Sequence, residues 1–278
     1  MSTFAIGGDI EVKRLGYGAM RITGKGVWGW PDDRTAAKAL LARVVELGIQ
    51  LIDTADAYGP ETSEYLLAEA LHPYDGLLIA TKGGLERGGP QEWTTNGRPE
   101  HLKIACANSL RRLEVDTIDL YQLHAIDDDV PLEDSIGALV ELQQEGKIRH
   151  IGVSNFNVEQ LERARKLATV VSVQNRYNLG DREHEAVVDY CTEHGIGFIP
   201  WYPLAAGKLV EREEFVDIAT KYEANAGQLA LAWLLRRSPV MLPIPGTSSI
   251  AHLEENTRGR DIALTDDDFE ALSALAAG

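Results

Sequence analysis

Basic residues are scarce in this chain of 278 residues, where 27 Lys and Arg stand against 43 Asp and Glu and the formal net charge is −16. Such a charge repels the phosphates of nucleic acids and anionic membrane surfaces, so we expect no nucleic-acid partner. Long apolar runs are also missing, because the longest, residues 229–235, is far shorter than the roughly 18 residues that suggest a membrane-spanning helix. We therefore expect no membrane partner.

Cysteine is rare as well. Cys106 and Cys191 are far apart, and no C-x-x-C motif or His/Cys cluster has metal-ligand spacing, so we expect reduced thiols and no metal. The amino-terminal segment has no basic start followed by an apolar core, unlike a signal peptide, and we expect a cytoplasmic protein. The acidic runs 127–129 and 266–268 fit either a solvated face or adaptation to a salty cytoplasm.

Two hydrophobic patterns alternate from about residue 34 onward. Short runs rich in Ile, Val and Leu precede longer stretches of helical periodicity, as in repeated βα units around a parallel sheet. The predicted strands are 14–17, 50–52, 77–81, 118–123, 150–153, 170–173, 197–200 and 240–244. The predicted helices are 35–47, 62–71, 100–113, 132–145, 158–167, 183–194, 226–237 and 251–257, with a short segment near 211–222. Without a linker or solenoid repeat, the sequence predicts an α/β protein with a single (β/α)8 TIM barrel domain over residues 1–278.

Two further elements are expected at the ends of the chain. Residues 3–6 and 10–13 flank the Gly-Gly-Asp segment 7–9, which predicts an N-terminal β-hairpin that could plug the floor of the barrel. Residues 264–276 predict a C-terminal helix capped by Thr265.

Polar residues come directly after several predicted strands. In a parallel barrel the active site is built at the carboxyl ends of the strands, so these residues are the candidates for chemistry. They are Asp53, Lys82, His124, Ser154, Asn155, Gln174, Trp201 and Gly246. A buried Asp–Lys pair alone is explained equally well by a structural role. The convergence of three of these side chains on one cavity, with Tyr58 five residues beyond Asp53, favours a functional site.

Six short motifs fall at predicted strand ends. They are LGYGAM (15–20), IDTADAYG (52–59), ATK (80–82), LYQLH (120–124), IGVSNF (151–156) and IPGTSS (244–249). In order and position they resemble the motifs of the aldo-keto reductases, essentially from end to end of the chain. The resemblance implies an NAD(P)H-dependent oxidoreductase that reduces aldehydes or ketones to alcohols without a metal. Its catalytic tetrad would be Asp53, Tyr58, Lys82 and His124.

The chemistry of carbonyl reduction suits these four side chains. Hydride delivery to a carbonyl carbon creates negative charge on the oxygen, which calls for a proton donor. Tyr58 would be this acid; its ordinary pKa of about 10 is high for the task, and Lys82 would lower that pKa by favouring the phenolate. Asp53 would hold Lys82 charged and in place. His124 could donate a hydrogen bond to the same carbonyl oxygen.

The resemblance also implies a cofactor site. Ser154, Asn155 and Gln174 would bind the nicotinamide carboxamide, and Trp201 would stack on the ring or else be a core aromatic. The full set of expected cofactor contacts is Ala19, Met20, Ser154, Asn155, Gln174, Trp201, Leu204, Gly246, Thr247, Ser248, Ser249, His252, Glu255 and Asn256. Glu255 and Asn256 could reach the adenine.

The phosphate-binding loop departs from the family pattern. Better-known members place Lys and Arg there to grip the 2′-phosphate of NADPH, whereas this chain has Gly246 and His252. Thr247, Ser248 and Ser249 at the expected N-terminus of a helix could still meet that phosphate. We therefore expect NADPH as cofactor, and NADH use stays open.

The substrate pocket departs from the pattern too, because Ala125 follows His124 where many members carry Trp, and a small-molecule carbonyl substrate would have more room. Trp28 and Trp30 could close over a ring substrate and Trp93 could form another wall, or all three could be packed loop anchors. Residues 14–20, 26–34 and 244–256 also look like the bacterial pyridoxal-reductase branch of the family. Pyridoxal is therefore a candidate substrate.

Other functional classes fit the sequence less well. Gly16 and Gly18 begin a G-x-G-x-x-G pattern, but Arg21 replaces its third glycine, which disfavours a Rossmann dehydrogenase. A P-loop motif is missing, and a glycosidase would need two facing carboxylates where only Asp53 is well placed. The remaining alternative is a cofactor-binding sensor or accessory subunit with little turnover. The oligomeric state stays open, and a monomer is compatible with the sequence.

Overall fold

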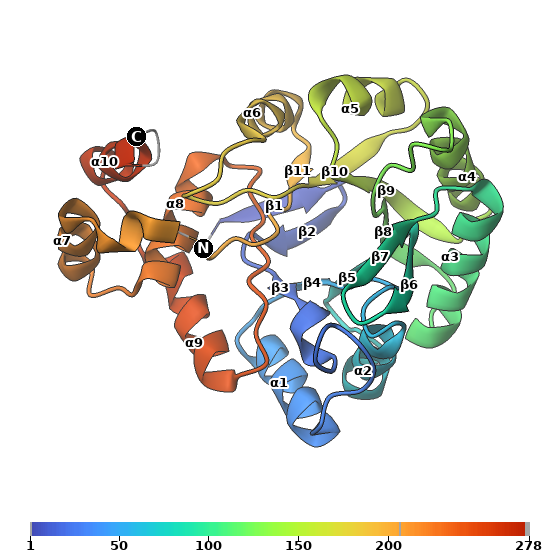
Figure 1. Cartoon of the computed structure of the whole chain (residues 1–278), viewed down its shortest axis with the longest axis horizontal. Coiled ribbons are helices and arrows are strands. Elements are labelled where there is room, and N and C mark those ends of the chain that lie inside the picture. Colours follow the sequence, from blue (N-terminus) through green and yellow to red (C-terminus); the bar gives the residue numbers. More distant parts are fainter. Residues whose placement is uncertain (1, 206, 276–278) are drawn as a thin grey trace.

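A parallel sheet of seven strands lies at the centre of the computed structural model, which describes residues 2–205 and 207–275. In spatial order the strands run β11-β10-β9-β8-β5-β4-β3. They are β3 (Tyr17–Gly18), β4 (Leu51–Asp53), β5 (Leu78–Gly83), β8 (Ile118–Leu123), β9 (Ile148–Ser154), β10 (Val170–Gln174) and β11 (Gly197–Phe198). The helices that alternate with them are α1 (Arg34–Glu46), α2 (Thr62–Leu71), α3 (Pro99–Leu113), α4 (Leu132–Gln144), α5 (Val158–Arg165), α6 (Glu185–His194) and α8 (Ala226–Arg237). Figure 1 shows these helices around the strands.

The strand predicted at 240–244 was wrong as a regular strand. One β-bridge, between Phe198 and Met241, joins this segment to β11. On its other side the Gly16 amide donates 2.9 Å to the Pro243 carbonyl. Proline has no N–H to donate, so Pro243 interrupts the ladder. The extended segment still lies between β11 and β3, and it closes the sheet into the (β/α)8 barrel that the sequence predicted.

The first barrel strand is also shorter than predicted, covering Tyr17–Gly18 rather than 14–17. The Arg14 amide donates instead to Ser2, and its guanidinium donates to the carbonyls of Leu235 and Ser238 at the end of α8. A Cβ at Gly18 would lie 2.8 Å from the Ile244 carbonyl. The glycine is therefore required for the close approach that seals the barrel.

The predicted N-terminal hairpin is confirmed as β1 (Thr3–Ile6) and β2 (Ile10–Lys13). Ile6 and Val12 are buried against apolar side chains from the barrel interior. Asp9 in the turn contacts His150, 2.7 Å away, and Arg149 near the start of β9. The hairpin thus covers the amino end of the barrel and leaves the carboxyl end for the site.

A second hairpin, at the carboxyl end, was not predicted. β6 (Leu85–Gly89) and β7 (Glu92–Thr95) pair antiparallel directly after β5. The connection contains Gln91 with φ of 64°. This hairpin lies beside the mouth of the barrel.

The remaining helices follow the predictions closely. They are α7 (Glu213–Lys221), α9 (Ile250–Arg258) and α10 (Asp266–Leu275). The short 3-10 helices η1 (Ala19–Ile22), η2 (Gly207–Glu211) and η3 (Gly259–Asp261) were not predicted. Thr265 accepts the Asp268 amide at 3.3 Å, as expected of the cap. The predicted end of this helix at Ala276 lies outside the described residues. Figure 1 shows α7 and α10 beside one another at the left edge.

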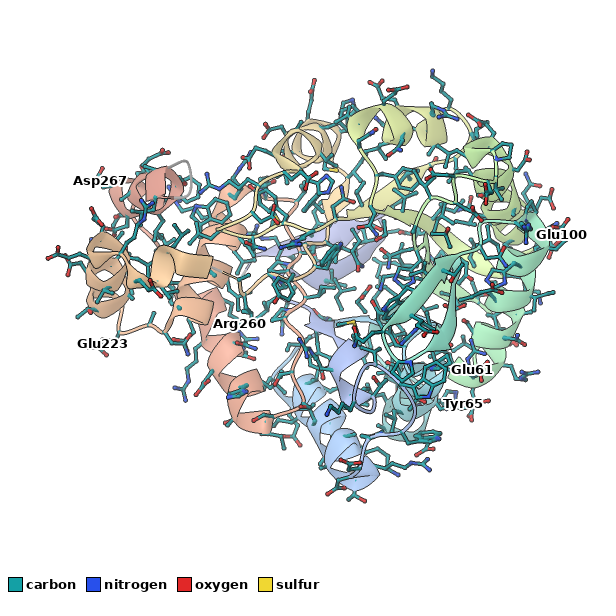
Figure 2. The ribbon with its side chains drawn as sticks, viewed as in Figure 1. Glu61, Tyr65, Glu100, Glu223, Arg260 and Asp267 are labelled. Atoms are coloured by element: carbon teal, nitrogen blue, oxygen red, sulfur yellow. The ribbon has the colours of Figure 1, made fainter. Side chains whose placement is uncertain are left out.

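Acidic side chains are spread over the exterior, where Figure 2 shows Glu100, Glu223 and Asp267 at the rim. The acidic runs are nevertheless partly structural. Asp127 is buried and its carboxylate accepts the Gly97 amide at 2.8 Å, and Asp268 is buried too. Within residues 2–205 and 207–275, no helix has the length and apolar character needed to cross a membrane.

Candidate active site

Four side chains predicted to act together meet at the carboxyl end of the barrel. Asp53 ends β4, Tyr58 lies in the following loop, Lys82 lies near the end of β5, and His124 follows β8. Lys82 Nζ donates to Asp53 Oδ2 at 2.6 Å, to the Thr54 carbonyl at 2.9 Å and to Tyr58 Oη at 3.3 Å. An ammonium has three donors, so every N–H of this fully buried side chain has a partner.

The second oxygen of Asp53 is also engaged. Asp53 Oδ1 accepts from the amide nitrogens of Gln122 at 3.2 Å and Gln174 at 2.8 Å. Buried charges persist when they are paired and hydrogen-bonded, and both conditions hold here. Gln122 was not among the predicted site residues, although a polar residue in the interior of an apolar strand is a signal for it. Gln174 was predicted for the cofactor, and it also holds the carboxylate.

Burial controls the electrostatics of Tyr58. Loss of water around the phenol raises the pKa of Tyr58 above its usual value, and this outweighs the opposing effect of Lys82. Lys82 lowers the pKa of Tyr58, as expected, but the sequence analysis did not take account of the larger and opposite effect of burial. Burial also disfavours charge on Lys82, but Asp53 and Tyr58 outweigh it and raise the pKa of Lys82.

His124 is a neutral imidazole beside Tyr58. Burial, together with the nearby Lys82 charge, holds the pKa of His124 well below its usual range. Its ring meets the Tyr58 ring edge to face, with centroids 5.8 Å apart. Nδ1 is buried without a hydrogen-bond partner among the described residues. A neutral ring carries one donor and one acceptor, so this histidine can donate without carrying charge.

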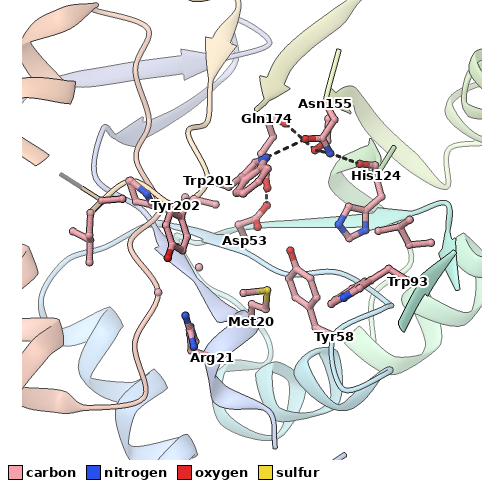
Figure 3. A pocket seen from close by; sticks show the side chains of 18 residues that line it. Met20, Arg21, Asp53, Tyr58, Trp93, His124, Asn155, Gln174, Trp201 and Tyr202 are labelled. Atoms are coloured by element: carbon pink, nitrogen blue, oxygen red, sulfur yellow. Dashed lines mark hydrogen bonds between the residues drawn. The ribbon is translucent and has the colours of Figure 1, made fainter. Parts of the chain in front are cut away.

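A polar network continues from His124 along β9 and β10 (Figure 3). Asn155 donates to the His124 carbonyl and to Ser154 Oγ, both at 3.2 Å, and accepts from the Trp201 indole at 3.1 Å. Ser154 in turn donates to the Gln174 carbonyl at 2.8 Å. Asn155 has φ of 63°, a left-handed conformation that asparagine tolerates well. The three predicted carboxamide-binding residues are thus held together beside Trp201.

These groups surround one cavity of about 740 Å³. Of the predicted residues, it is lined by Met20, Asp53, Tyr58, His124, Ser154, Asn155, Gln174, Trp201, Leu204 and Gly246. Lys82 lies beneath Tyr58. Gly18, Arg21, Leu85 and Tyr202 also line the cavity and were not predicted as site residues. Among the described lining residues, Arg21 is the one with a permanent positive charge.

The other predicted cofactor residues do not line this cavity. The Ala19 side chain is fully buried and its carbonyl accepts from Ser63 at 3.3 Å. Thr247 accepts the Ser249 amide at 3.0 Å, and Ser249 caps α9 by accepting the His252 amide at 3.4 Å. The remaining members lie in the same loop and on α9, and are Ser248, Glu255 and Asn256.

The three loop tryptophans differ in position. Trp93, on β7, lines the cavity and meets the Tyr58 ring edge to face at 6.4 Å. Trp30 packs on Tyr65 and under the Arg34 guanidinium instead. Trp28 lies outside the cavity lining. Trp93 is therefore a wall of the cavity, whereas Trp30 is a packed loop anchor. Within the described part of the chain, no three His, Cys, Asp or Glu side chains are placed to hold a metal ion.

Comparisons with known proteins agree with this geometry. The family model described as aldo/keto reductase family matches residues 14–277. An uncharacterized oxidoreductase of Schizosaccharomyces pombe is 51% identical over 266 residues, which is 95% of this chain and 87% of that protein. Pyridoxine 4-dehydrogenase of Escherichia coli is 40% identical over 282 residues, 99% of this chain and 98% of that protein. An aldo-keto reductase from Klebsiella pneumoniae, solved in complex with NADPH, superposes with a TM-score of 0.83 at 27% identity, covering 99% of this chain and 95% of that one.

Proposed function

The chain belongs to the aldo/keto reductase family of oxidoreductases, and on that premise we propose that it reduces an aldehyde or ketone to an alcohol with NADPH, using Tyr58 as the proton donor. The observation that carries the proposal is the hydrogen bond between Lys82 Nζ and Tyr58 Oη at the floor of the cavity, with His124 alongside. Tyr58 lines the cavity and also lies beside a buried cation, the Lys82 ammonium.

Each member of the tetrad has a separate task. Asp53 keeps Lys82 charged, because the pair is buried and close. Lys82 then stabilises the negative charge that Tyr58 acquires when its proton leaves. Tyr58 stays protonated at neutral pH because burial raises its pKa, so the acid is in the correct state before reaction.

His124 orients the carbonyl group of the substrate. A neutral imidazole donates one hydrogen bond and adds no second cation beside Lys82. Its edge-to-face contact with Tyr58 places both rings at the same end of the cavity. The carbonyl oxygen of the substrate would accept hydrogen bonds from both residues, so its negative charge would develop beside donors that are already in place. Such electrostatic stabilisation of the transition state is usually the largest contribution to catalysis.

The residues around Trp201 fit a nicotinamide. A carboxamide has both donors and an acceptor, and Ser154, Asn155 and Gln174 present a hydroxyl and two amides beside the indole. Trp201 would stack on the ring. When bound, NADPH would supply the hydride for the carbonyl carbon. The cavity volume of about 740 Å³ lies within the usual range of ligand sites.

NADPH is the proposed cofactor because the Klebsiella pneumoniae reductase, 95% of whose chain superposes on this one, was solved with NADPH. The 2′-phosphate would meet the exposed Ser248 and the backbone at the start of α9, where unpaired N–H groups favour anions. Glu255 and Asn256 on the same helix would reach the adenine, and NADH remains an alternative.

Pyridoxal is the proposed test substrate. The Escherichia coli relative named pyridoxine 4-dehydrogenase covers nearly the whole chain at 40% identity. Pyridoxal is the aldehyde of pyridoxine, and its flat ring suits an end of the cavity lined by Leu85, Trp93 and Tyr58.

The experiment is a substrate panel of pyridoxal, aromatic and aliphatic aldehydes and ketones, followed by the loss of NADPH absorbance. Saturable NADPH oxidation with at least one carbonyl is the expected result. Quenching of tryptophan fluorescence by NADPH without any turnover would contradict the proposal and favour a cofactor-binding sensor.

A further inference from the structure

Arg87 occupies an unusual position in the β6–β7 hairpin beside the cavity. Its guanidinium points into the space between three segments of the chain and donates only to backbone carbonyls in the described structure. The acceptors are Glu92 at 2.9 Å, Val27 at 2.8 Å, Ala57 at 2.8 Å, Gly26 at 3.3 Å and Gly89 at 3.2 Å. Arginine has five N–H donors in a rigid plane, and these bonds use all of them.

The same guanidinium stacks on an aromatic wall of the cavity. Its central carbon lies 3.7 Å from the centroid of the Trp93 ring and 5.6 Å from that of Trp28. At the shorter distance the cation–π contact is close. Trp93 lines the cavity and meets Tyr58 edge to face. Arg87 therefore fixes Trp93 from behind, while Trp93 faces the substrate end.

Of the three segments that Arg87 joins, the Tyr58 loop and the β6–β7 hairpin line the cavity, and the loop before α1 packs against both from outside. Val27 belongs to the loop before α1, and Ala57 directly precedes Tyr58. Beyond Arg87, the loop before α1 contacts the Tyr58 loop through the bridge between Trp28 and Gly59. Arg87 joins the hairpin to both loops, because its planar guanidinium donates to carbonyls of both at the same time. Lysine would keep the charge but has neither the plane nor five donors.

We propose that Arg87 is a positioning residue that locks Trp93 against Tyr58 and thereby sets the substrate end of the cavity for flat aromatic aldehydes. The inference rests on the proposed function and deepens it. An aromatic aldehyde would gain contact from a fixed Trp93 face, whereas a short aliphatic aldehyde would not reach that wall. Loosening the wall should therefore cost binding of aromatic aldehydes selectively.

The test compares Arg87→Lys and Arg87→Met with the unaltered protein, using benzaldehyde and propanal as probes. We expect KM for benzaldehyde to rise about tenfold, KM for propanal to stay within about twofold, and kcat and NADPH affinity to change little. Arg163→Lys is the matched control, because Arg163 makes several hydrogen bonds to Glu133 on the outer helices. It should leave the benzaldehyde-to-propanal ratio of KM unchanged.

A double-mutant cycle separates positioning from a merely structural role. If Arg87 acts through Trp93, Trp93→Leu should raise KM for benzaldehyde to a similar extent, and adding Arg87→Met to it should add little. An unchanged ratio of KM in Arg87→Lys, or full additivity in the cycle, would overturn the inference. If Arg87→Met fails to fold, Arg87→Lys and Trp93→Leu still decide the matter. Failure of the proposed function would be recognised separately, because the unaltered protein would then oxidise no NADPH with either aldehyde.

Discussion

Lys82 donates a hydrogen bond of 3.3 Å to the hydroxyl of Tyr58, and this contact connects a buried ion pair to the open cavity. Beneath it, Asp53 accepts from Lys82 and from two glutamines. Several hydrogen bonds thus hold the Asp53 carboxylate in one position, and the Lys82 ammonium that it binds also contacts Tyr58, the proposed acid. A charge fixed before reaction costs no reorganisation when the transition state forms.

The first prediction concerns stability. Asp53→Asn should lower the free energy of unfolding by about 3 kcal/mol, because it leaves the Lys82 charge buried without its counter-charge. Lys82→Met should destabilise similarly through the unpaired carboxylate. The double variant should recover part of the loss, since replacing a whole buried pair is far less costly than breaking it. Urea denaturation measures all three, and additive losses in the double variant would contradict the prediction.

The second prediction concerns pH and rate. Reduction needs Tyr58 protonated and His124 neutral, and the pKa of Tyr58 is raised above 10 while that of His124 is held below 6.5. We expect kcat/KM for reduction to be flat between about pH 6.5 and 9, with losses only outside that window. An alkaline loss centred near neutral pH would contradict it.

The third prediction uses His124 as a probe of stability. Its pKa is depressed in the folded protein, so between that value and about 6.5 the unfolded chain binds more protons. Stability from this residue is present above pH 6.5 and is lost as the pH falls. From pH 7 to 5 the free energy of unfolding should therefore fall more steeply in the unaltered protein than in His124→Gln. Equal slopes of unfolding free energy in the two proteins would contradict this.

The fourth prediction concerns the cofactor. Arg21 lines the cavity beside Gly246. A Cβ added to Gly246 would lie 3.5 Å from the Arg21 side chain. Arg21→Gln should weaken NADPH and NADH about tenfold alike, because we expect Arg21 to meet the diphosphate that both share. Lys166 is exposed at the end of α5. Lys166→Gln makes the same change of charge and should leave the affinity for both cofactors unchanged. Fluorescence titration measures the affinities, and an unchanged Kd for both cofactors would contradict the prediction.

Much of this arrangement could be predicted from the sequence, because regular alternation and strand-end position report directly on a parallel barrel. Asp53, Lys82 and His124 each follow an apolar run, and they meet as expected. The segment at 240–244 could not be foreseen as irregular from its apolar pattern alone, since proline changes hydrogen bonding and not hydropathy.

Tertiary contacts account for what was missed. Arg87 binds carbonyls from segments that are distant in sequence, and Arg21 approaches Gly246 only because the barrel closes. The direction of the pKa shift of Tyr58 depends on how completely the fold excludes water from the phenol. The residues next to Tyr58 in the sequence do not indicate this degree of burial. That the entire chain acts as a single domain remains a prediction.

The most direct test of the account is NADPH-dependent carbonyl reduction by Tyr58→Phe, measured beside NADPH binding by fluorescence. The variant loses only the hydroxyl that donates the proton, so we predict that kcat falls by about 10²-fold to 10⁴-fold while Kd for NADPH is unchanged. Reduction at the rate of the unaltered protein would contradict the role assigned to Tyr58.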